Sequence, residues 1–258
     1  MRENGLQRGV DQGALLVGTW VTMIRNPAIM SLLKAVGADF VRVDMEHTGM
    51  SMETIADMAL MARSIDLPMV VRPPAANREW ITRLLDVGVW NILCPQVESS
   101  EHAAAIVAAS RYAPMGCRGI GGLGPAMDFL PPQSAAEHRM HANRQVFITV
   151  MLETARAFED LDAIAAMDGI DALTLGPGDL AQELRVAGTA DEARIVDSKR
   201  DEIFAACRKH GKTAAMLVGD PAQVRRYIEA GVTMFTYSSD VEILHSGFRR
   251  AVASIRAA

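Results

Sequence analysis

Short apolar segments alternate with longer segments of mixed polarity along the whole chain. Eight of the short segments have the length and the β-branched content of buried strands. We expect these strands at residues 15–21, 39–44, 68–73, 91–96, 146–152, 172–176, 213–218 and 234–238. The segments between them predict helices, because Ser51 and Asn77 stand at N-cap positions and Gly37 follows the last residue of an apolar repeat.

Eight strands that alternate with helices in 258 residues are typical of a (β/α)8 barrel, the TIM barrel. We therefore expect residues 1–258 to form a single barrel domain. A doubly wound sheet is the alternative, but it usually has fewer strands and begins with a glycine-rich turn, which the first connection, VTMIRNPA, does not contain. The one long irregular stretch, residues 113–145, has the length of a functional loop.

Composition and charge exclude several classes of protein. Half of the residues are hydrophobic and the formal net charge is −5, so the chain can bury a large core and has no basic footprint for a nucleic acid. No apolar run reaches the length of a membrane helix, and the N-terminus has no signal-peptide pattern. The cysteines Cys94, Cys117 and Cys207 have neither a disulfide nor a zinc spacing. We expect a cytoplasmic protein with no nucleic-acid or membrane partner.

Polar side chains gather after the carboxyl ends of the predicted strands, which is where a barrel has its active site. These side chains are Asp44, Glu46, His47, Arg72, Gln96, Glu153 and Asp179. The opposite ends of the same strands have no comparable set. We therefore expect these residues to meet at one mouth of the barrel.

Glu153 and Asp179 are the candidate metal ligands. Each has an ordinary explanation alone, as a carboxylate in the first turn of a helix or as a helix N-cap. Together, at the ends of adjacent parallel strands, they can converge on one hard cation and leave other positions for water and substrate oxygens. Ligation by oxygen alone favours Mg²⁺ or Mn²⁺ over Zn²⁺, with Co²⁺ as a further candidate.

His47 and Arg72 are the candidates for proton transfer and for anion binding. A single histidine in a turn is often only solvated, but Asp86, at the end of the third predicted helix, could orient the ring and raise its basicity. Arg72 at a barrel mouth indicates an anion to pair with, and therefore an anionic substrate.

Several segments then match a known family in order and spacing. The segments GTW, VDMEH, VVRPP, LLDVGVWNILCPQVES, RYAPMGCRGIG, MLET and GPGDLA resemble those of the HpcH/HpaI aldolases, the metal-dependent class II pyruvate aldolases. The family includes 4-hydroxy-2-oxoheptanedioate and 2-keto-3-deoxy-sugar-acid aldolases, and the resemblance extends from Gly13 to Tyr237. It implies a barrel whose C-terminal helix swaps onto a neighbouring barrel, in a homohexamer built as a trimer of dimers.

The resemblance also implies how the metal and the substrate are held. A divalent metal on Glu153 and Asp179 would chelate the keto and carboxylate oxygens of pyruvate. Arg72 would bind the keto oxygen, and the backbone of Gly176, Pro177 and Gly178 would help to seat the carboxylate.

Proton transfer and support of the site would fall to the segment after the second strand. The resemblance implies that His47, paired with Asp86, acts with a metal-associated water as the acid and base. Asp44 would organise metal-bound waters and Glu46 would support the loop. Cleavage of a 4-hydroxy-2-oxoacid needs an electron sink, and the strand ends contain carboxylates but no lysine, which disfavours an imine mechanism.

The sequence departs from the family pattern at positions that are expected to bind the aldehyde. Met151 stands where the family usually has Gln, Gly178 replaces a common Ala, and residues 121–130 contain GPAMDF where many members have Arg-Ala. The loss of two polar groups predicts a less polar or differently shaped aldehyde. The residues expected around it are Met127, Leu217 and Val218.

Two other functions stay open at this point. A citryl- or malyl-thioester lyase of the same superfamily would need a coenzyme A site, and no adenine- or pantetheine-binding cluster is apparent. A non-catalytic barrel that binds a keto acid is the second. The joint presence of His47, Arg72, Glu153 and Asp179 argues against it, because a binding protein does not need the base.

Overall fold

Eight parallel strands form the centre of the computed structural model, which describes residues 2–258. They are β1 (Leu16–Val21), β2 (Phe40–Asp44), β3 (Met69–Arg72), β4 (Asn91–Cys94), β5 (Phe147–Leu152), β6 (Ala172–Leu175), β7 (Thr213–Val218) and β8 (Met234–Ser239). Each strand pairs with the next in the sequence and β8 pairs with β1, so the sheet is a closed barrel. The predicted fold class and the eight predicted strands are confirmed.

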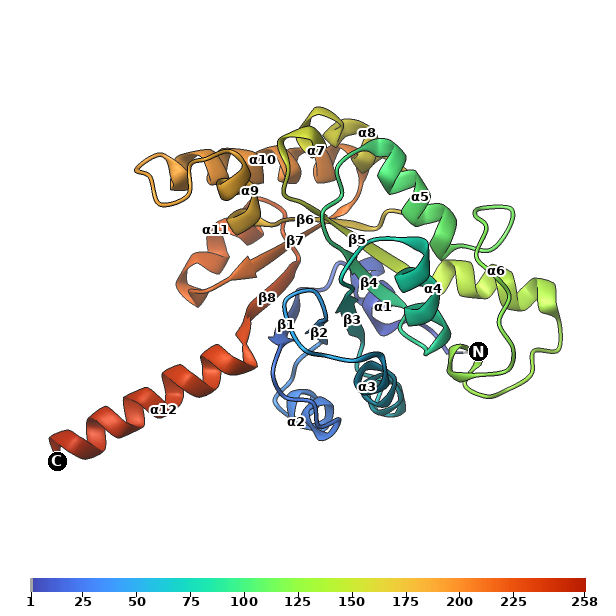
Figure 1. Cartoon of the computed structure of the whole chain (residues 1–258), viewed down its shortest axis with the longest axis horizontal. Coiled ribbons are helices and arrows are strands. Elements are labelled where there is room, and N and C mark those ends of the chain that lie inside the picture. Colours follow the sequence, from blue (N-terminus) through green and yellow to red (C-terminus); the bar gives the residue numbers. More distant parts are fainter. Residues whose placement is uncertain (1) are drawn as a thin grey trace.

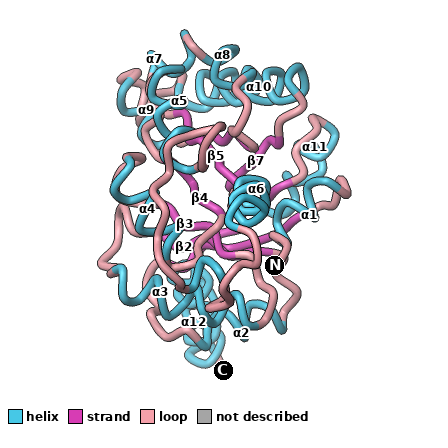
Figure 2. Tube along the Cα trace, turned by 90° about the vertical axis from the view of Figure 1, so that its right-hand side faces the viewer, coloured by secondary structure: helices cyan, strands magenta, loops and turns pink. Residues whose placement is uncertain are grey.

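Helices surround the strands (Figures 1 and 2). They are α1 (Gly5–Asp11), α2 (Ala28–Ala35), α3 (Met52–Ser64), α4 (Arg78–Asp86), α5 (Ser100–Ser110), α6 (Ala135–Gln145), α7 (Ala155–Glu159), α8 (Leu161–Ala166), α9 (Pro177–Glu183), α10 (Glu192–His210), α11 (Val224–Glu229) and α12 (Asp240–Ala257), with 3-10 turns at Pro125–Met127 and Pro221–Gln223. Within residues 2–258, no helix combines the length and the apolar character that crossing a bilayer requires.

Local signals explain most helix boundaries. The Ser51 hydroxyl accepts a hydrogen bond from the Thr54 N–H at 3.2 Å, and the Asn77 side chain accepts one from the Trp80 N–H at 3.1 Å, so both predicted N-caps are confirmed. The prediction that residues 113–145 are irregular throughout is wrong for the last 11 residues. These form α6, where the Ser134 hydroxyl caps the helix by accepting from the Glu137 N–H.

Successive side chains along each strand point to opposite faces of the sheet and form two hydrophobic cores. One set of side chains, including Phe40, Phe147 and Met234, fills the inside of the barrel, and α1 closes the amino-terminal end with Leu6. The other set, including Val41 and Val43, packs between the strands and the outer helices. The carboxyl end of the barrel, opposite α1, is where the strands end and the polar residues that follow them begin.

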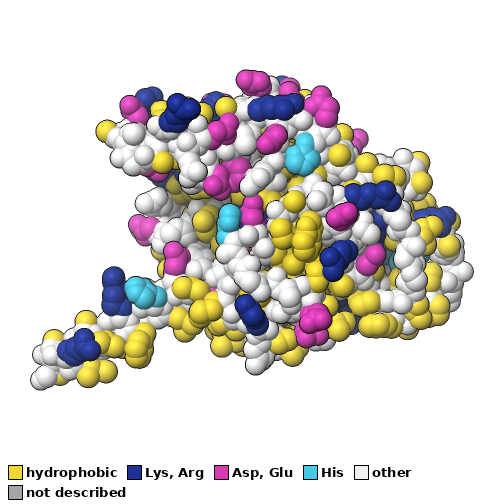
Figure 3. Space-filling model, viewed as in Figure 1, with side chains coloured by type: hydrophobic (Ala, Val, Ile, Leu, Met, Phe, Trp, Pro, Cys, Tyr) yellow, Lys and Arg dark blue, Asp and Glu magenta, His cyan; other side chains and the backbone are white. Residues whose placement is uncertain are grey.

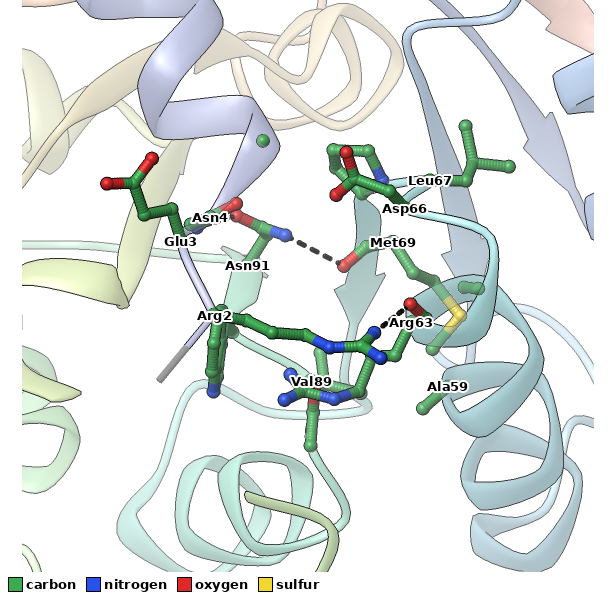
Figure 4. A pocket seen from close by; sticks show the side chains of 15 residues that line it. Arg2, Glu3, Asn4, Ala59, Arg63, Asp66, Leu67, Met69, Val89 and Asn91 are labelled. Carbon is green, nitrogen blue, oxygen red and sulfur yellow. Dashed lines mark hydrogen bonds between the residues drawn. The ribbon is translucent and has the colours of Figure 1, made fainter. Parts of the chain in front are cut away.

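The amino-terminal end also has a small cavity, of about 50 Å³, but its polar groups bond to one another (Figure 4). The Asn91 amide donates to the Met69 carbonyl oxygen at 3.2 Å, and the Asn4 amide donates to the Asn91 side-chain oxygen at 2.6 Å. The Arg2 guanidinium donates to the Arg63 carbonyl oxygen. These contacts hold the amino-terminal end of the barrel together.

Helix α12 projects from the barrel at its first residue (Figure 1). Asp240 fixes this end, because its carboxylate accepts hydrogen bonds from the backbone N–H groups of Thr22, Met23 and Ile24. Burial alone would raise the pKa of Asp240, but these donors outweigh it and lower the pKa. Further along, the helix is exposed and carries apolar side chains, with Phe248 and Ile255 both about three-quarters exposed (Figure 3).

Candidate active site

A cavity of about 260 Å³ opens at the carboxyl end of the barrel. Its wall includes most of the predicted site residues: His47, Arg72, Glu153, Gly176, Pro177, Gly178, Asp179 and Leu217. These residues therefore meet at one mouth of the barrel, as predicted from their positions at and after the strand ends.

Arg72 is held in place by two carboxylates. Asp44 and Arg72 are register partners at the last positions of β2 and β3, and they form a two-pronged pair, with Nε to Oδ1 at 2.8 Å and Nη2 to Oδ2 at 2.7 Å. The third nitrogen, Nη1, lies 3.1 Å from Oε2 of Glu46, and the guanidinium lies over the Trp20 ring, 4.9 Å from its centre.

These contacts correct one sequence argument. Arg72 was expected to be unpaired and so to require an anionic substrate, but Asp44 already neutralises it. Burial alone would lower the pKa of Arg72, and the hydrogen bonds and charges of Asp44 and Glu46 outweigh this effect and raise it. The guanidinium is therefore a charged and rigid donor at neutral pH.

Glu153 is a buried carboxylate with one oxygen unused. It directly follows β5 and is 3% exposed. Its Oε1 accepts from the backbone N–H of Gln96 at 2.6 Å, whereas its Oε2 is buried and has no hydrogen-bond partner. Burial raises the pKa of Glu153 to about 7; the Gln96 N–H opposes this rise, and the charges of Asp179 and Glu46 add to it.

The chain makes space for that unused oxygen at Gly176. Leu152 and Leu175 are register partners on β5 and β6, so Glu153 and Gly176 follow them side by side. A Cβ atom on residue 176 would lie 2.0 Å from Glu153 Oε2, which only glycine avoids. Pro177 then begins α9, and Asp179 lies in its first turn.

Glu153 and Asp179 fit a divalent cation. The orphaned Oε2 is a strong acceptor without a donor, and a second carboxylate lies close enough to raise its pKa. Over the described part of the chain, no three His, Cys, Asp or Glu side chains form a complete metal cage. A cation on this pair would thus keep positions for water and substrate oxygens, as catalytic Mg²⁺ sites do.

His47 and Asp86 do not meet within residues 2–258. The His47 side chain is 58% exposed, and its Nε2 lies 3.6 Å from Oε2 of Glu46. Asp86 ends α4 in the outer ring, where its carboxylate accepts from Arg118 Nη2 at 3.1 Å. The pairing expected from the sequence is therefore not formed inside the chain, because the loop that carries Arg118 takes up Asp86.

Residues 17–246 match the family model described as HpcH/HpaI aldolase/citrate lyase. The chain belongs to this family. The resemblance seen in the sequence is confirmed, and the match extends over nearly the whole barrel.

Two relatives of this family are named 5-keto-4-deoxy-D-glucarate aldolase. The protein from Escherichia fergusonii is 33% identical over 241 residues, which cover 93% of this chain and 92% of the relative. The protein from Klebsiella pneumoniae is 32% identical over 234 residues, which cover 91% and 90%. The crystal structure of the HpcH/HpaI aldolase from Desulfitobacterium hafniense has a TM-score of 0.92 and 30% identity, and covers 97% of this chain and 96% of that one.

The expected aldehyde-side residues of this family member separate in space. Leu217 is exposed on the cavity wall, and Met151 lies on it with its sulfur 4.0 Å from Arg72 Nη1. Met127 instead lies in the turn Pro125–Met127 and lines a different hollow with Trp90, and Val218 is buried outside the cavity wall. The expectation that these two residues line the same site is wrong.

Sequence reasoning assigned no site role to four residues of the cavity wall, which are Trp20, Arg42, Thr174 and Leu175. Trp20 lies within β1 and reads as an ordinary strand residue, although it belongs to the GTW segment that resembles the family. Arg42 had a signal: it is a charged residue at an inward-facing position of the strand FVRVD, between Phe40 and Asp44.

Proposed function

We propose that the protein is a divalent-metal-dependent aldolase that reversibly cleaves a 4-hydroxy-2-oxoacid to pyruvate and an aldehyde. The observation that carries this proposal is the orphaned Glu153 Oε2, which is buried near Asp179 in the wall of the cavity that also holds Arg72. The family and the names of its relatives support the reaction class.

The residues have separate tasks in this reaction. Mg²⁺, Mn²⁺ or Co²⁺ held by Glu153 and Asp179 would polarise the keto oxygen as a Lewis acid. Arg72 donates to the same oxygen and stabilises the charge that develops there when the bond between C3 and C4 breaks. Asp44 keeps the guanidinium charged and oriented while it does so.

Substrate seating and proton transfer fall to the rim of the cavity. Backbone N–H groups at the start of α9, around Gly176 to Gly178, receive the substrate carboxylate. His47, exposed at the mouth and next to Glu46, accepts the proton of the C4 hydroxyl as the bond between C3 and C4 breaks, and a proton is then returned to C3 to give pyruvate. Leu217 and Met151 present an apolar surface, which favours an aldehyde less polar than a sugar acid.

Pyruvate release tests the proposal directly. Protein stripped of metal is given Mg²⁺, Mn²⁺ or Co²⁺ and a panel of 4-hydroxy-2-oxoacids, from 5-keto-4-deoxy-D-glucarate to alkyl-substituted compounds, and a lactate dehydrogenase couple reports pyruvate. We expect release that requires metal and is fastest with the less polar members. Release that persists in a chelator would exclude the metal mechanism. Cleavage of a citryl or malyl thioester, with none of the panel, would favour the thioester lyase.

We further propose a homohexamer in the cytoplasm, assembled through α12. The exposed apolar residues of this projecting helix, including Phe248 and Ile255, are more than a monomer usually presents on one helix. Three free cysteines suit a reducing compartment. Sedimentation equilibrium should give six times the mass of the chain, and truncation after residue 239 should give a smaller species. A monomer at micromolar concentration would contradict the assembly.

A further inference from the structure

Arg42 is a buried cation that the proposed reaction does not use. It lies on β2 between Phe40 and Asp44, points into the barrel and is 1% exposed. Its Nε and Nη2 atoms are sealed from water and have no hydrogen-bond partner. The residue nevertheless belongs to the wall of the active-site cavity. A buried polar group without a partner is costly, so this arginine requires an explanation.

Within residues 2–258, no carboxylate forms an ion pair with Arg42. The ion pairs found in residues 2–258 do not include it, and the carboxylate two residues away, Asp44, is already committed to Arg72. The guanidinium instead lies over the rings of Trp20 and Phe40, at 5.5 and 5.9 Å from their centres. Burial and then the charge of Arg72 lower the pKa of Arg42 to about 9, so it remains protonated at neutral pH.

The cavity reaches this guanidinium at its third nitrogen. Nε and Nη2 are closed to solvent, whereas Nη1 is not among the closed atoms and makes no hydrogen bond within residues 2–258, so Nη1 is the atom that a carboxylate in the cavity would meet. The hydroxyls of Thr149 and Thr236 are also buried without partners within residues 2–258. Each lies two residues along its strand from a residue that faces the barrel interior, Phe147 or Met234, and therefore faces the interior as well. The interior thus contains a cation and hydroxyl donors that no group of the protein satisfies.

The position of Arg42 shows which part of a substrate it can reach. Two strand residues span about 6.6 Å, so Arg42 lies deeper than Asp44 by about that distance. The proposed carboxylate seat at the start of α9 follows β6, which is four strands from β2 and therefore on the opposite wall. A group at Arg42 is thus neither that carboxylate nor the aldehyde at the mouth.

We infer that Arg42 binds a second carboxylate on the keto-acid half of the substrate, so that the site accepts 2-oxodicarboxylates in addition to pyruvate. This inference rests on the proposed function for the placement of the keto acid. Arg42 is then the residue that selects the keto acid, while Leu217 and Met151 face the aldehyde.

Calorimetric titration of the Mg²⁺-loaded protein tests this. The probes are 2-oxopentanoate and 2-oxoglutarate, which differ only in a methyl or carboxylate group at C5, and the four-carbon pair 2-oxobutyrate and freshly dissolved oxaloacetate. We expect at least one dicarboxylate to bind about tenfold or more tightly than its partner. Arg42→Leu should abolish this preference, and Arg42→Lys should keep part of it.

Controls separate binding from folding. Arg83→Leu removes an exposed arginine that also lies over a tryptophan, Trp80 at 5.5 Å, and should leave the preference unchanged. Arg42→Leu should fold, because an apolar side chain often replaces a buried charge without loss of stability, and its melting temperature is measured alongside.

Each outcome decides the inference. Equal affinities within both pairs, or a preference that survives in Arg42→Leu, would overturn it. Binding of formate or chloride that depends on Arg42, without any preference for the dicarboxylates, would also overturn the inference. Arg42 would then bind a free anion and not a carboxylate of the substrate. If pyruvate and all four oxoacids fail to bind the Mg²⁺-loaded protein, the proposed function fails together with this inference, whereas pyruvate release without a preference removes only this inference.

Discussion

Glu153→Gln is expected to reduce the metal-dependent cleavage rate by roughly 10³-fold, which corresponds to about 4 kcal/mol of transition-state stabilisation. Glutamine has nearly the same shape and can still accept the Gln96 N–H, which lies 2.6 Å from Oε1 in the wild type. It cannot supply the negative charge at Oε2. With only Asp179 left as an anionic ligand, we expect Mg²⁺ or Mn²⁺ to bind about 100-fold more weakly or worse.

The thermal stability of the metal-free variant should not fall, although its activity and metal affinity do. Burial and the charges of Asp179 and Glu46 raise the pKa of Glu153, so its ionised form is unfavourable in the metal-free fold. Metal-free Glu153→Gln should therefore melt at the same temperature as the wild type or higher, and added metal should no longer raise its melting temperature. Glu159→Gln, at the exposed end of α7, serves as the control and should behave as wild type. An unaltered metal affinity in Glu153→Gln would remove Glu153 from the site.

The alternation of short apolar segments with longer mixed segments was sufficient to predict the eight strands of the barrel. The strands agree with the predictions to within two residues at each end, because each combines inward and outward apolar positions over a short run. The helix expected after β5 divides at Asp160 into α7 and α8. Asp160 accepts hydrogen bonds from the backbone and the hydroxyl of Ser100, a contact between distant segments that no local pattern indicates.

The site was predictable wherever residues directly follow strands. Asp44, Arg72 and Glu153 occupy positions that strand register fixes, so their convergence follows from the fold alone. Asp86 and Met127 depend instead on how the 113–134 stretch packs, and both were placed wrongly relative to the cavity within the chain.

At Arg42, the sequence predicts where the side chain points but not what surrounds it. The alternation of inward and outward residues along β2 predicts that Arg42 faces the barrel interior. Its lack of a hydrogen-bond partner depends on side chains from several other strands and is seen only in the folded structure. Only the assembled structure shows that Asp44, the nearest carboxylate in the sequence, already pairs with Arg72.

Gly176→Ala is expected to weaken metal binding and cleavage by on the order of 10- to 100-fold, the range seen when the support of a metal ligand is removed. The new Cβ would lie 2.0 Å from Glu153 Oε2 and 2.9 Å from the Glu153 Cβ, so the carboxylate must move. The backbone at residue 176 has a φ of −94°, which alanine adopts without strain, so the effect should come from the displaced ligand and not from misfolding.

Gly178→Ala provides a matched control two residues away. A Cβ at residue 178 meets no atom within 4 Å, and alanine in the first turn of α9 favours the helix. We expect this variant to keep its metal affinity and to be as stable as the wild type or slightly more stable. Calorimetric metal titration of both variants measures the contrast. Equal behaviour of the two would show that the contact between Gly176 and Glu153 does not position the carboxylate. A selective loss in Gly176→Ala would show that this glycine is required because Glu153 needs the space beside it.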